Sequence, residues 1–371
     1  MKIALICDWL TGMRGGERCL EAVCEIYPQA DIFTLIYFPG TVSTTIESHR
    51  IRTSYIQKLP CNIKSFRRYL PLFSHAIQQF DLTDYNLVIS FSHCVAKNVR
   101  VPKNIPHICY CHTPMRYAWQ MRNEYLKSLN FIKKIPAGFM LDYLKKYDRN
   151  TAARVTHFIA NSKYVQNRIY QAYKRDSVVI YPPVDYERFT LSNVDEGYFL
   201  IVSALVPYKR VDIAIDAFNN LAAKLLVIGN GPQLQKLKCS ASANISFIEN
   251  ASDNEVADYM QKCTALLFPG EEDFGIVPLE AQACGKPVIA FGRGGALETV
   301  IGLNSTDSNQ DIATGIFFYK QTPESLREAI LFFEQNRNKI KSINCRNNIL
   351  RFGRQLYKEA FQKFIHNAIK S

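Results

Sequence analysis

The chain has 371 residues and lacks any hydrophobic run of the roughly 20 residues that a membrane-spanning helix needs. Its first residues, Met1 to Asp8, form too short an apolar run for a signal peptide and lack a small-residue cleavage site, so we expect them to form a strand. No low-complexity tract and no short-period repeat is found, which argues against a repeat architecture. The hydrophobic fraction of 47% is that of an ordinary globular protein.

Zinc-like cysteine spacing is also missing. The 11 cysteines are an odd number, and most lie within apolar runs, as buried thiols do in a reducing compartment. Cys109, Cys111 and His112 are close in sequence, but no second ligand pair follows at the spacing of a zinc site. We therefore expect no metal and a cytoplasmic protein.

The positive charge is concentrated in the first half of the chain. Residues 1–181 hold 25 Lys and Arg against 12 Asp and Glu (net +13), whereas residues 182–371 hold 20 against 21 (net −1). Two stretches are both basic and apolar: Ile56 to Phe73, with Lys58, Lys64, Arg67 and Arg68, and Leu126 to Arg149, with Lys127, Lys133, Lys134, Lys145, Lys146 and Arg149. Such surfaces suit anionic lipid, so we expect peripheral contact with the inner face of the cytoplasmic membrane. A solvated face is the plain alternative, and nucleic acid is not expected as a partner.

Apolar runs alternate with helical patterns, which predicts an α/β protein with largely parallel sheets. Strands are expected at Lys2–Cys7, Asp31–Ile36, Asn86–Phe91, His107–Tyr110, His157–Asn161, Val178–Tyr181, Tyr198–Ser203, Lys224–Ile228, Ile245–Ile248, Ala265–Phe268, Val288–Phe291 and Gly315–Phe318. Glu47 to Leu82 has no clean strand pattern and is interpreted as an insertion of short helices. The prolines of Tyr181–Phe189 interrupt regular structure, so we predict domains at 1–182 and 190–352, followed by a helix within 353–371.

One stretch, Phe268 to Pro287, carries the strongest chemical signal. A buried strand is followed by an acidic loop and then by a helix whose start is marked by Pro278. The amides of Gly275, Ile276 and Val277 would point out of that helix start, where partial positive charge favours a phosphate. Glu272 and Glu280 lie on either side of these amides. An ordinary solvated βα corner is the alternative to a site for a diphosphate flanked by sugars.

Glu272-Asp-Phe-Gly-Ile-Val-Pro-Leu-Glu280 resembles the E-x7-E motif of glycosyltransferase family 4. The resemblance implies the GT-B fold, in which two Rossmann-like domains face a central cleft and the C-terminal helix crosses back to the first domain. It also implies a nucleotide-sugar donor and retention of configuration at the anomeric carbon. By the same resemblance Glu280 binds the ribose and Glu272 the transferred sugar, with Phe274 in the same loop.

Further donor-binding residues follow other strands of the second half. Ser203 to Arg210 ends in two adjacent cations, Lys209 and Arg210, which would neutralise the leaving diphosphate. Many family members carry an Arg five residues before the Lys, where this chain has Ala204. The loop Gly229-Asn230-Gly-Pro resembles the family's loop near the nucleotide. The same resemblance implies that Phe247 to Asn250 contact the edge of the nucleotide base. The turn from Gly292 to Glu298 is interpreted as architectural.

Motifs of the first half are assigned to the acceptor and to the transferred sugar. Asp8 to Glu17 resembles the family's Gly-Gly-Glu loop, in which Gly15 and Gly16 contact the donor phosphates and Asp8 and Arg14 lie on the acceptor side. His112 follows a strand end, at the position where the family places a His beside the transferred sugar. Ser92, His93 and Lys97 end another strand and are predicted to bind the acceptor.

Together these motifs resemble those of bacterial mannosyltransferases of surface-polysaccharide and O-antigen assembly. The resemblance implies transfer of mannose from GDP-mannose to a lipid-linked saccharide. The chain has no Asp-x-Asp pair, with which glycosyltransferases of the other common fold hold a divalent metal, so metal-independent transfer is expected. Two alternatives stay open: a UDP-sugar (glucose or N-acetylglucosamine) transferase of the same fold, and a non-catalytic basic binding module for membrane or nucleic acid.

Overall fold

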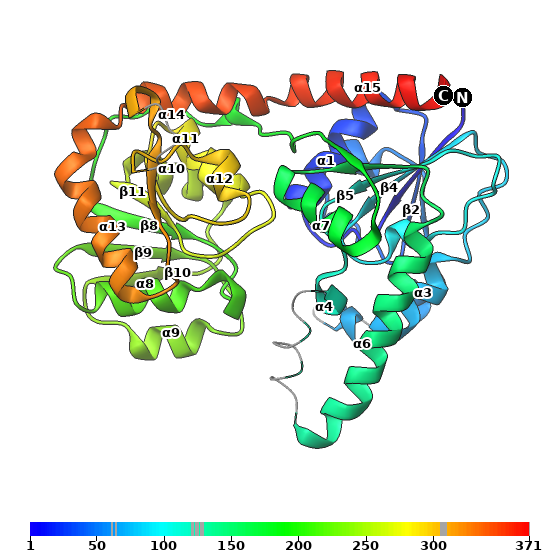
Figure 1. The fold of residues 1–371 in the computed structure, drawn as a ribbon, viewed down its shortest axis with the longest axis horizontal. Coiled ribbons are helices and arrows are strands. Elements are labelled where there is room, and N and C mark those ends of the chain that lie inside the picture. The colour runs from blue at the N-terminus through cyan, green and yellow to red at the C-terminus, as the bar shows by residue number, and fades with distance from the viewer. Residues whose placement is uncertain are drawn as a thin grey trace. The chain divides into compact units, whose positions relative to one another are not determined.

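The computed structural model describes residues 1–60, 62–63, 65–119, 122, 126, 130–304 and 310–370. They divide into two compact units, unit 1 from Met1–Pro183 and Arg354–Ser371 and unit 2 from Val184–Gly353 (Figure 1). The chain passes from one unit to the other after Pro183 and returns after Gly353. The final helix therefore belongs to the same unit as the first strand.

The described part of unit 1 forms a seven-stranded parallel sheet in the order β3-β2-β1-β4-β5-β6-β7. The strands are β1 (Ile3–Cys7), β2 (Asp31–Thr34), β3 (Ile51–Thr53), β4 (Leu87–Ser92), β5 (His107–Cys111), β6 (His157–Ala160) and β7 (Ser177–Val179). The helices include α1 (Gly15–Ile26), α2 (Thr44–Glu47), α3 (Leu70–Ile77), α4 (Arg116–Trp119), α6 (Phe131–Ala152), α7 (Lys163–Tyr173) and α15 (Arg354–Lys370), with 3-10 turns η1 (Tyr55–Lys58), η2 (Phe66–Tyr69) and η3 (Ala96–Asn98).

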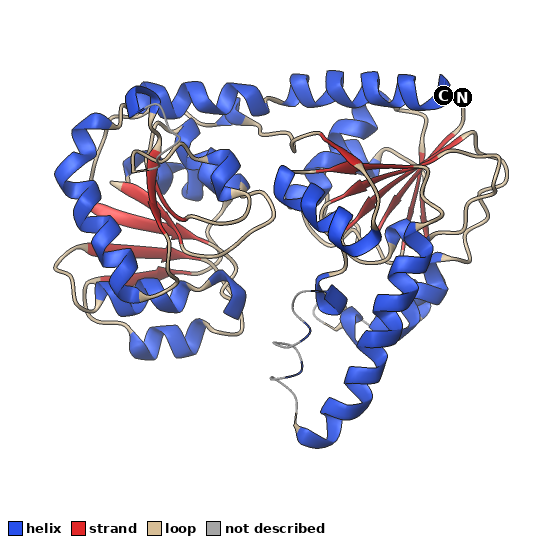
Figure 2. Ribbon diagram, viewed as in Figure 1, coloured by secondary structure: helices blue, strands red, loops and turns tan. Residues whose placement is uncertain are grey.

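Helices cover both faces of this sheet (Figure 2). Ile3 and Leu5 of β1 pack with α1 and α15, whereas Ala4 and Ile6 pack with α3 and α6. Successive residues of a strand point to opposite faces, so a strand covered on both sides reads as one unbroken apolar run. The run Ile-Ala-Leu-Ile-Cys of β1 is buried at every position for this reason.

Strand β3 corrects one sequence prediction. Glu47 to Leu82 was interpreted as helices only, yet Ile51–Thr53 pairs in parallel with β2 at the sheet edge. This strand has three residues, none of them fully buried, and one is an arginine. An edge strand of this length leaves no hydrophobic alternation for a sequence pattern to detect.

The described part of unit 2 repeats the architecture with a six-stranded parallel sheet in the order β10-β9-β8-β11-β12-β13. The strands are β8 (Tyr198–Val202), β9 (Lys224–Ile228), β10 (Ile245–Ile248), β11 (Ala265–Phe268), β12 (Val288–Phe291) and β13 (Gly315–Phe318). The helices include α8 (Val211–Phe218), α9 (Leu234–Ser240), α10 (Asp253–Lys262), α11 (Ile276–Ala283), α12 (Ala296–Thr299), α13 (Pro323–Asn336) and α14 (Ser342–Ile349), with 3-10 turns η4 (Tyr186–Arg188), η5 (Pro207–Lys209), η6 (Gln310–Ile312), η7 (Arg337–Lys339) and η8 (Leu350–Phe352).

Central strands of unit 2 coincide with the predicted ones, because they are short apolar runs bounded by glycine or polar loops. Their alternate residues, such as Phe199 and Ile201 of β8, form one core with α8 and α13. All pairings in the sheet are parallel, so the loops that follow β9, β8 and β11 leave from the same edge. The loops with the predicted donor residues are therefore neighbours.

Among the described residues, no helix is both long enough and apolar enough to cross a membrane.

Candidate active site

In unit 2, the loops after β8 and β11 are joined by an ion pair between Lys209 and Glu272. Both side chains are mostly buried, at 18% and 19% exposed. Lys209 ends the 3-10 turn η5, and Gly270 lets the second loop pass close to it, since an added Cβ would lie 3.0 Å from the Cα of Lys209. The structure thus brings together a cation and a carboxylate from two separate motifs.

The helix α11 begins immediately after this loop. Gly275 precedes it with a φ of 92°, a left-handed conformation that glycine adopts without steric cost. Ile276 and Val277 occupy its first turn, whose N–H groups have no carbonyl acceptor within the helix. Glu280 lies four residues after Ile276 and so shares its helix face. Phe274 is buried before the helix start and packs against Phe352 at 5.5 Å between ring centroids.

Two glycines after β12, Gly294 and Gly295, pack closely against the loop that carries Glu272. The N–H of Gly295 donates to the carbonyl of Glu272 at 2.8 Å. An added Cβ would meet the backbone at both positions, 2.4 Å from the Glu272 oxygen at Gly294 and 2.3 Å from the Cα of Phe274 at Gly295. These contacts give the turn from Gly292 to Glu298 an architectural role.

Ser203, Gly229 and Asn230 lie together, as parallel pairing of β8 and β9 requires. The N–H of Leu205 donates to the carbonyl of Asn230 at 2.9 Å, and an added Cβ at Gly229 would lie 1.9 Å from the Ser203 carbonyl oxygen. The Asn230 amide donates to the Asn250 side chain at 2.9 Å. The segment predicted to contact the base is therefore next to the glycine loop.

Arg210 is directed differently from its neighbour Lys209. Its backbone is left-handed, with a φ of 53°, and its guanidinium contacts the Asp212 carboxylate at 3.2–3.3 Å. The two adjacent cations thus have different partners in the structure. Lys209 pairs with Glu272 of the loop after β11, whereas Arg210 interacts with the first turn of α8.

In unit 1, the start of α1 lies against His112, which follows β5. Gly15 and Gly16 are the first two residues of the helix, and an added Cβ at Gly16 would lie 3.4 Å from Nε2 of His112. The imidazole therefore lies against the first turn of α1, at ordinary van der Waals distance from an added Cβ. The N–H of Arg14, just before this helix, donates to the Glu17 carboxylate at 3.1 Å, and burial raises the pKa of the Glu17 carboxyl above its ordinary value.

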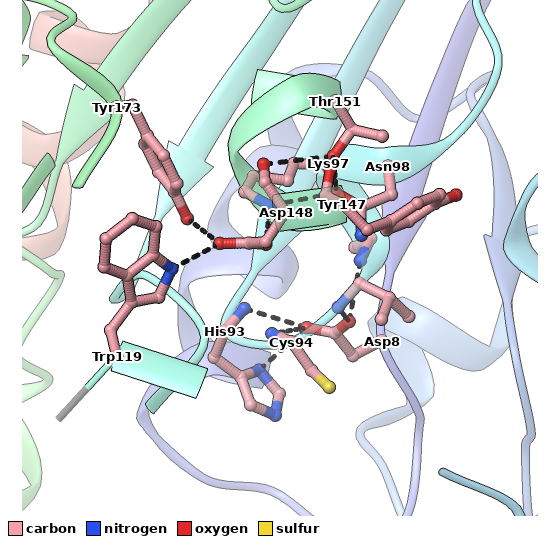
Figure 3. Close-up of polar contacts among 12 residues, drawn as sticks. Asp8, His93, Cys94, Lys97, Asn98, Trp119, Tyr147, Asp148, Thr151 and Tyr173 are labelled. Atoms are coloured by element: carbon pink, nitrogen blue, oxygen red, sulfur yellow. Dashed lines mark hydrogen bonds and ion pairs between the residues drawn. The ribbon is translucent and has the colours of Figure 1, made fainter. Parts of the chain in front are cut away.

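Asp8, predicted to bind the acceptor, instead holds the loop after β4 (Figure 3). Its carboxylate is buried and accepts from the backbone N–H groups of four consecutive residues, 93–96, at 2.6–2.9 Å. Its Oδ2 also lies 3.1 Å from Nδ1 of His93, whose ring is 37% exposed. The imidazole packs edge-on against Trp9, and its centroid lies 6.4 Å from that of His112. Asp8 therefore positions His93.

Ser92 and Lys97, also predicted to bind the acceptor, are buried in this structure. Ser92 accepts through its carbonyl from the N–H of His112 at 2.9 Å, which links the ends of β4 and β5. The Lys97 ammonium forms an ion pair with Asp148 of α6 and donates to Asn98 at 2.9 Å. With its ammonium enclosed in this way, Lys97 is not presented to a ligand, and we leave both side chains out of the acceptor-binding set.

Sequence reasoning missed the partners of Lys97. The second oxygen of Asp148 accepts from Nε1 of Trp119 at 2.8 Å and from the Tyr173 hydroxyl at 2.7 Å (Figure 3). The chain separates these residues widely, so no local motif could have identified the cluster.

Within the described residues no group of His, Cys, Asp and Glu is arranged to hold a metal ion. The predicted Lys64 and Lys127 lie outside those residues.

Two family models match consecutive parts of the chain. The model described as "Glycosyltransferase Family 4" matches residues 13–188, and "Glycosyl transferases group 1" matches residues 185–350. The Uncharacterized glycosyltransferase MJ1178 of Methanocaldococcus jannaschii is 32% identical over 255 residues, 67% of this chain. The Alpha-1,3/1,6-mannosyltransferase ALG2 of Kluyveromyces lactis is 26% identical over 353 residues (80% of the chain), and the O-antigen chain mannosyltransferase RfbU of Salmonella typhimurium is 29% identical over 176 residues (43%). The chain spans 64%, 68% and 47% of the lengths of these three relatives.

Solved structures show the fold. Anabaena Alr3699/HepE in complex with UDP and glucose superposes with a TM-score of 0.72 at 18% identity, over 98% of this chain and 99% of that one. The apo lipopolysaccharide outer core galactosyltransferase WaaB superposes with a TM-score of 0.68 at 18% identity, over 99% of each chain. Both units thus have the α/β fold of GT-B glycosyltransferases. With two family models that together match residues 13–350, the chain belongs to the family-4 glycosyltransferases.

Proposed function

We propose that this glycosyltransferase moves mannose from GDP-mannose to a lipid-linked saccharide, with retention at the anomeric carbon, in cell-surface polysaccharide biosynthesis. The observation that carries a nucleotide-sugar donor is the pairing of Lys209 with Glu272 beside the start of α11. The choice of mannose rests on the relatives, which include ALG2 and RfbU mannosyltransferases.

In the proposed reaction, unit 2 binds the donor. The first-turn amides of α11 and the Lys209 ammonium meet the charge of the diphosphate, which grows as the sugar leaves. Glu280 binds the ribose hydroxyls and Glu272 the sugar hydroxyls. We assign Glu272 to positioning and charge stabilisation and a donor phosphate oxygen to the role of base. Backbone amides and a lysine then supply the positive charge, so the reaction needs no metal.

Unit 1 supplies the acceptor side. His112 lies beside Gly16 at the start of α1, and in this proposal it contacts the transferred sugar. His93, in the loop after β4, has a side chain that is 37% exposed and is positioned by Asp8. We therefore assign His93, together with Arg14, to acceptor binding. The lipid-linked acceptor places the enzyme at an anionic membrane surface.

A UDP-sugar is the second candidate donor. The solved structures that share the fold include one that contains UDP and glucose. Its 18% identity shows fold similarity alone, so nucleotide binding is the test between guanine and uracil as the base of the donor.

Thermal unfolding in the presence of GDP, UDP and ADP identifies the nucleotide of the donor, because a ligand that binds only the folded protein raises the melting temperature. We expect GDP to give the largest shift. Incubation with GDP-mannose and lipid-linked saccharides, followed by NMR of the product, then identifies the sugar and its anomeric configuration. A larger shift with UDP, or an inverted product, would contradict the proposal, and no shift with any nucleotide would favour a non-catalytic binding module.

A further inference from the structure

We propose that the exposed face of the first half of α6 docks on an anionic lipid bilayer. The inference deepens the proposed function, on which it rests for the lipid-linked acceptor. It names the part of the molecule that makes the membrane contact.

Four large apolar side chains of α6 are open to solvent: Ile135, Phe139, Met140 and Tyr143, at 58%, 75%, 40% and 61% exposed. Phe139 has the highest value among the large apolar side chains of the described residues. Residues 135, 139 and 143 are each four apart and therefore lie on one face of the helix. A contiguous apolar surface of this kind marks a site of contact with a partner or a membrane.

The opposite face of α6 explains why the exposed one is free to make contact. Leu141 and Leu144 are 3% exposed and pack in the core of unit 1 beneath the sheet. The helix is thus fixed by one face, and its first turns extend away from the sheet of unit 1 (Figure 1). The folded core does not use Phe139 or Tyr143, so stability alone does not account for them.

Charge distinguishes lipid from a generic apolar partner. Lys146 and Arg149 are exposed one to two turns after Tyr143, and Lys134 is partly exposed before it. Unit 1 holds 29 Lys and Arg against 13 Asp and Glu (net +16), whereas unit 2 holds 16 against 20 (net −4). Apolar side chains that enter the acyl boundary, with lysines at the level of anionic headgroups, are the arrangement of interfacial helices.

The basic stretch from Ile56 to Phe73 lies beside α6, which belongs to the other basic stretch. The Tyr147 hydroxyl of α6 donates to the carbonyl of Ser74 in α3 at 3.3 Å. Next to α3, Arg67 and Arg68 are exposed in the turn η2, and Leu72 of α3 is 40% exposed. Two stretches separated in sequence are therefore adjacent in unit 1, which strengthens attraction to an anionic surface.

The same helix is tied to the predicted acceptor loop. Asp148 of α6 pairs with buried Lys97, which follows the loop whose amides Asp8 holds. His93 begins that loop and contacts Asp8 directly (Figure 3). Docking of α6 would therefore fix the orientation of the acceptor loop to the bilayer that holds the acceptor.

Vesicle sedimentation tests the proposal with the full chain. The probe is a vesicle of phosphatidylcholine with phosphatidylglycerol, compared with phosphatidylcholine alone. We expect the wild type to sediment with anionic vesicles only, and Phe139→Ser combined with Tyr143→Ser to weaken the partitioning by about tenfold or more. Leu331→Ser combined with Ile343→Ser is the matched control, because these residues of unit 2 are 54% and 50% exposed. Equal melting temperatures show that all variants fold.

Three outcomes would overturn the inference: no binding of the wild type to anionic vesicles, unchanged binding of the α6 variant, or equal loss in the unit 2 control. Sedimentation equilibrium identifies the rival occupant, since a dimer that the α6 substitutions dissociate, without vesicle binding, makes this face a self-interface. The nucleotide shift is measured on the same samples. A vesicle-bound protein without a nucleotide shift would retain the docking surface and reject the proposed donor, and the reverse result would reject only the docking surface.

Discussion

The ammonium group of Lys209 and the carboxylate of Glu272 form an ion pair that connects the loops after β8 and β11. Each group neutralises the other while both are largely enclosed. In the proposed reaction the donor diphosphate replaces Glu272 as the partner of the Lys209 ammonium, and the Glu272 carboxylate then accepts hydrogen bonds from sugar hydroxyls. The pair thus keeps two opposite charges in place for a ligand that needs both.

The first prediction concerns the charge of Glu272. Glu272→Gln keeps the shape of the side chain but removes the carboxylate, so turnover should fall by about 10²–10³, the cost of losing one group that stabilises developing charge. The nucleotide-induced rise in melting temperature should persist. Glu271→Gln, one residue earlier, is the control and should stay close to the wild type. Wild-type turnover in Glu272→Gln would show that its role is misassigned.

Lys209 and Arg210 allow a second test, because their directions differ. Lys209→Ala should reduce turnover by about tenfold or more and weaken the nucleotide-induced shift, since the cation beside Glu272 is lost. Arg210→Ala should cost less, because its guanidinium is engaged with Asp212. Steady-state kinetics on both variants decide the order. A larger loss in Arg210→Ala would mean that this side chain turns to the diphosphate when the donor binds.

Metal dependence is the third prediction. The proposed site meets the diphosphate with Lys209 and the first-turn amides of α11, so EDTA should leave initial rates unchanged. The assay compares EDTA-treated enzyme with and without added Mg²⁺ or Mn²⁺. Activity lost in EDTA and restored only by a divalent ion would remove this electrostatic account.

The sequence predicted the sheets of unit 2 well, because each central strand is a short apolar run with a clear boundary. The candidate site positions at strand ends of unit 1 were predicted from a second argument, that the carboxyl ends of parallel strands meet at one edge of a sheet. The edge strand β3 was missed, because three half-buried residues give no periodic signal.

The roles of single polar residues were harder to predict. Asp8 and Lys97 follow strands, as ligands often do, yet Asp8 accepts from four amides and Lys97 pairs with Asp148. Position in the sequence shows which edge a residue reaches, whereas burial and partners depend on distant segments. Lys97 illustrates this most clearly, since its partner is in a helix about 50 residues later.

A fourth prediction separates close packing from backbone strain at two glycines of unit 2. Gly294 and Gly197 have similar left-handed φ values, 67° and 73°. An added Cβ meets the Glu272 oxygen at 2.4 Å at Gly294 but nothing within 4 Å at Gly197. Alanine at either position costs about 1–2 kcal/mol for the left-handed backbone. Only Gly294→Ala should also displace the Glu272 loop, so it should lower turnover further, and equal kinetics for the two variants would show that the loop tolerates the Cβ.

The last prediction concerns acid stability and His107 of β5. Burial lowers the pKa of this imidazole from 6.5 to about 3, and its Nε2 lies 2.8 Å from the Ser90 hydroxyl. Because the folded state holds the ring neutral, its contribution to stability is complete above the unfolded pKa and is lost as the pH falls from about 6.5 towards 3. Between pH 7 and pH 5 the free energy of unfolding of unit 1 should drop by about 2 kcal/mol more in the wild type than in His107→Gln.

Urea titration followed by tryptophan fluorescence reports on this unit, since both tryptophans, Trp9 and Trp119, belong to it. His75→Gln, at an exposed histidine of α3, is the matched control. An equal drop in wild type and His107→Gln would show that other groups cause the acid sensitivity.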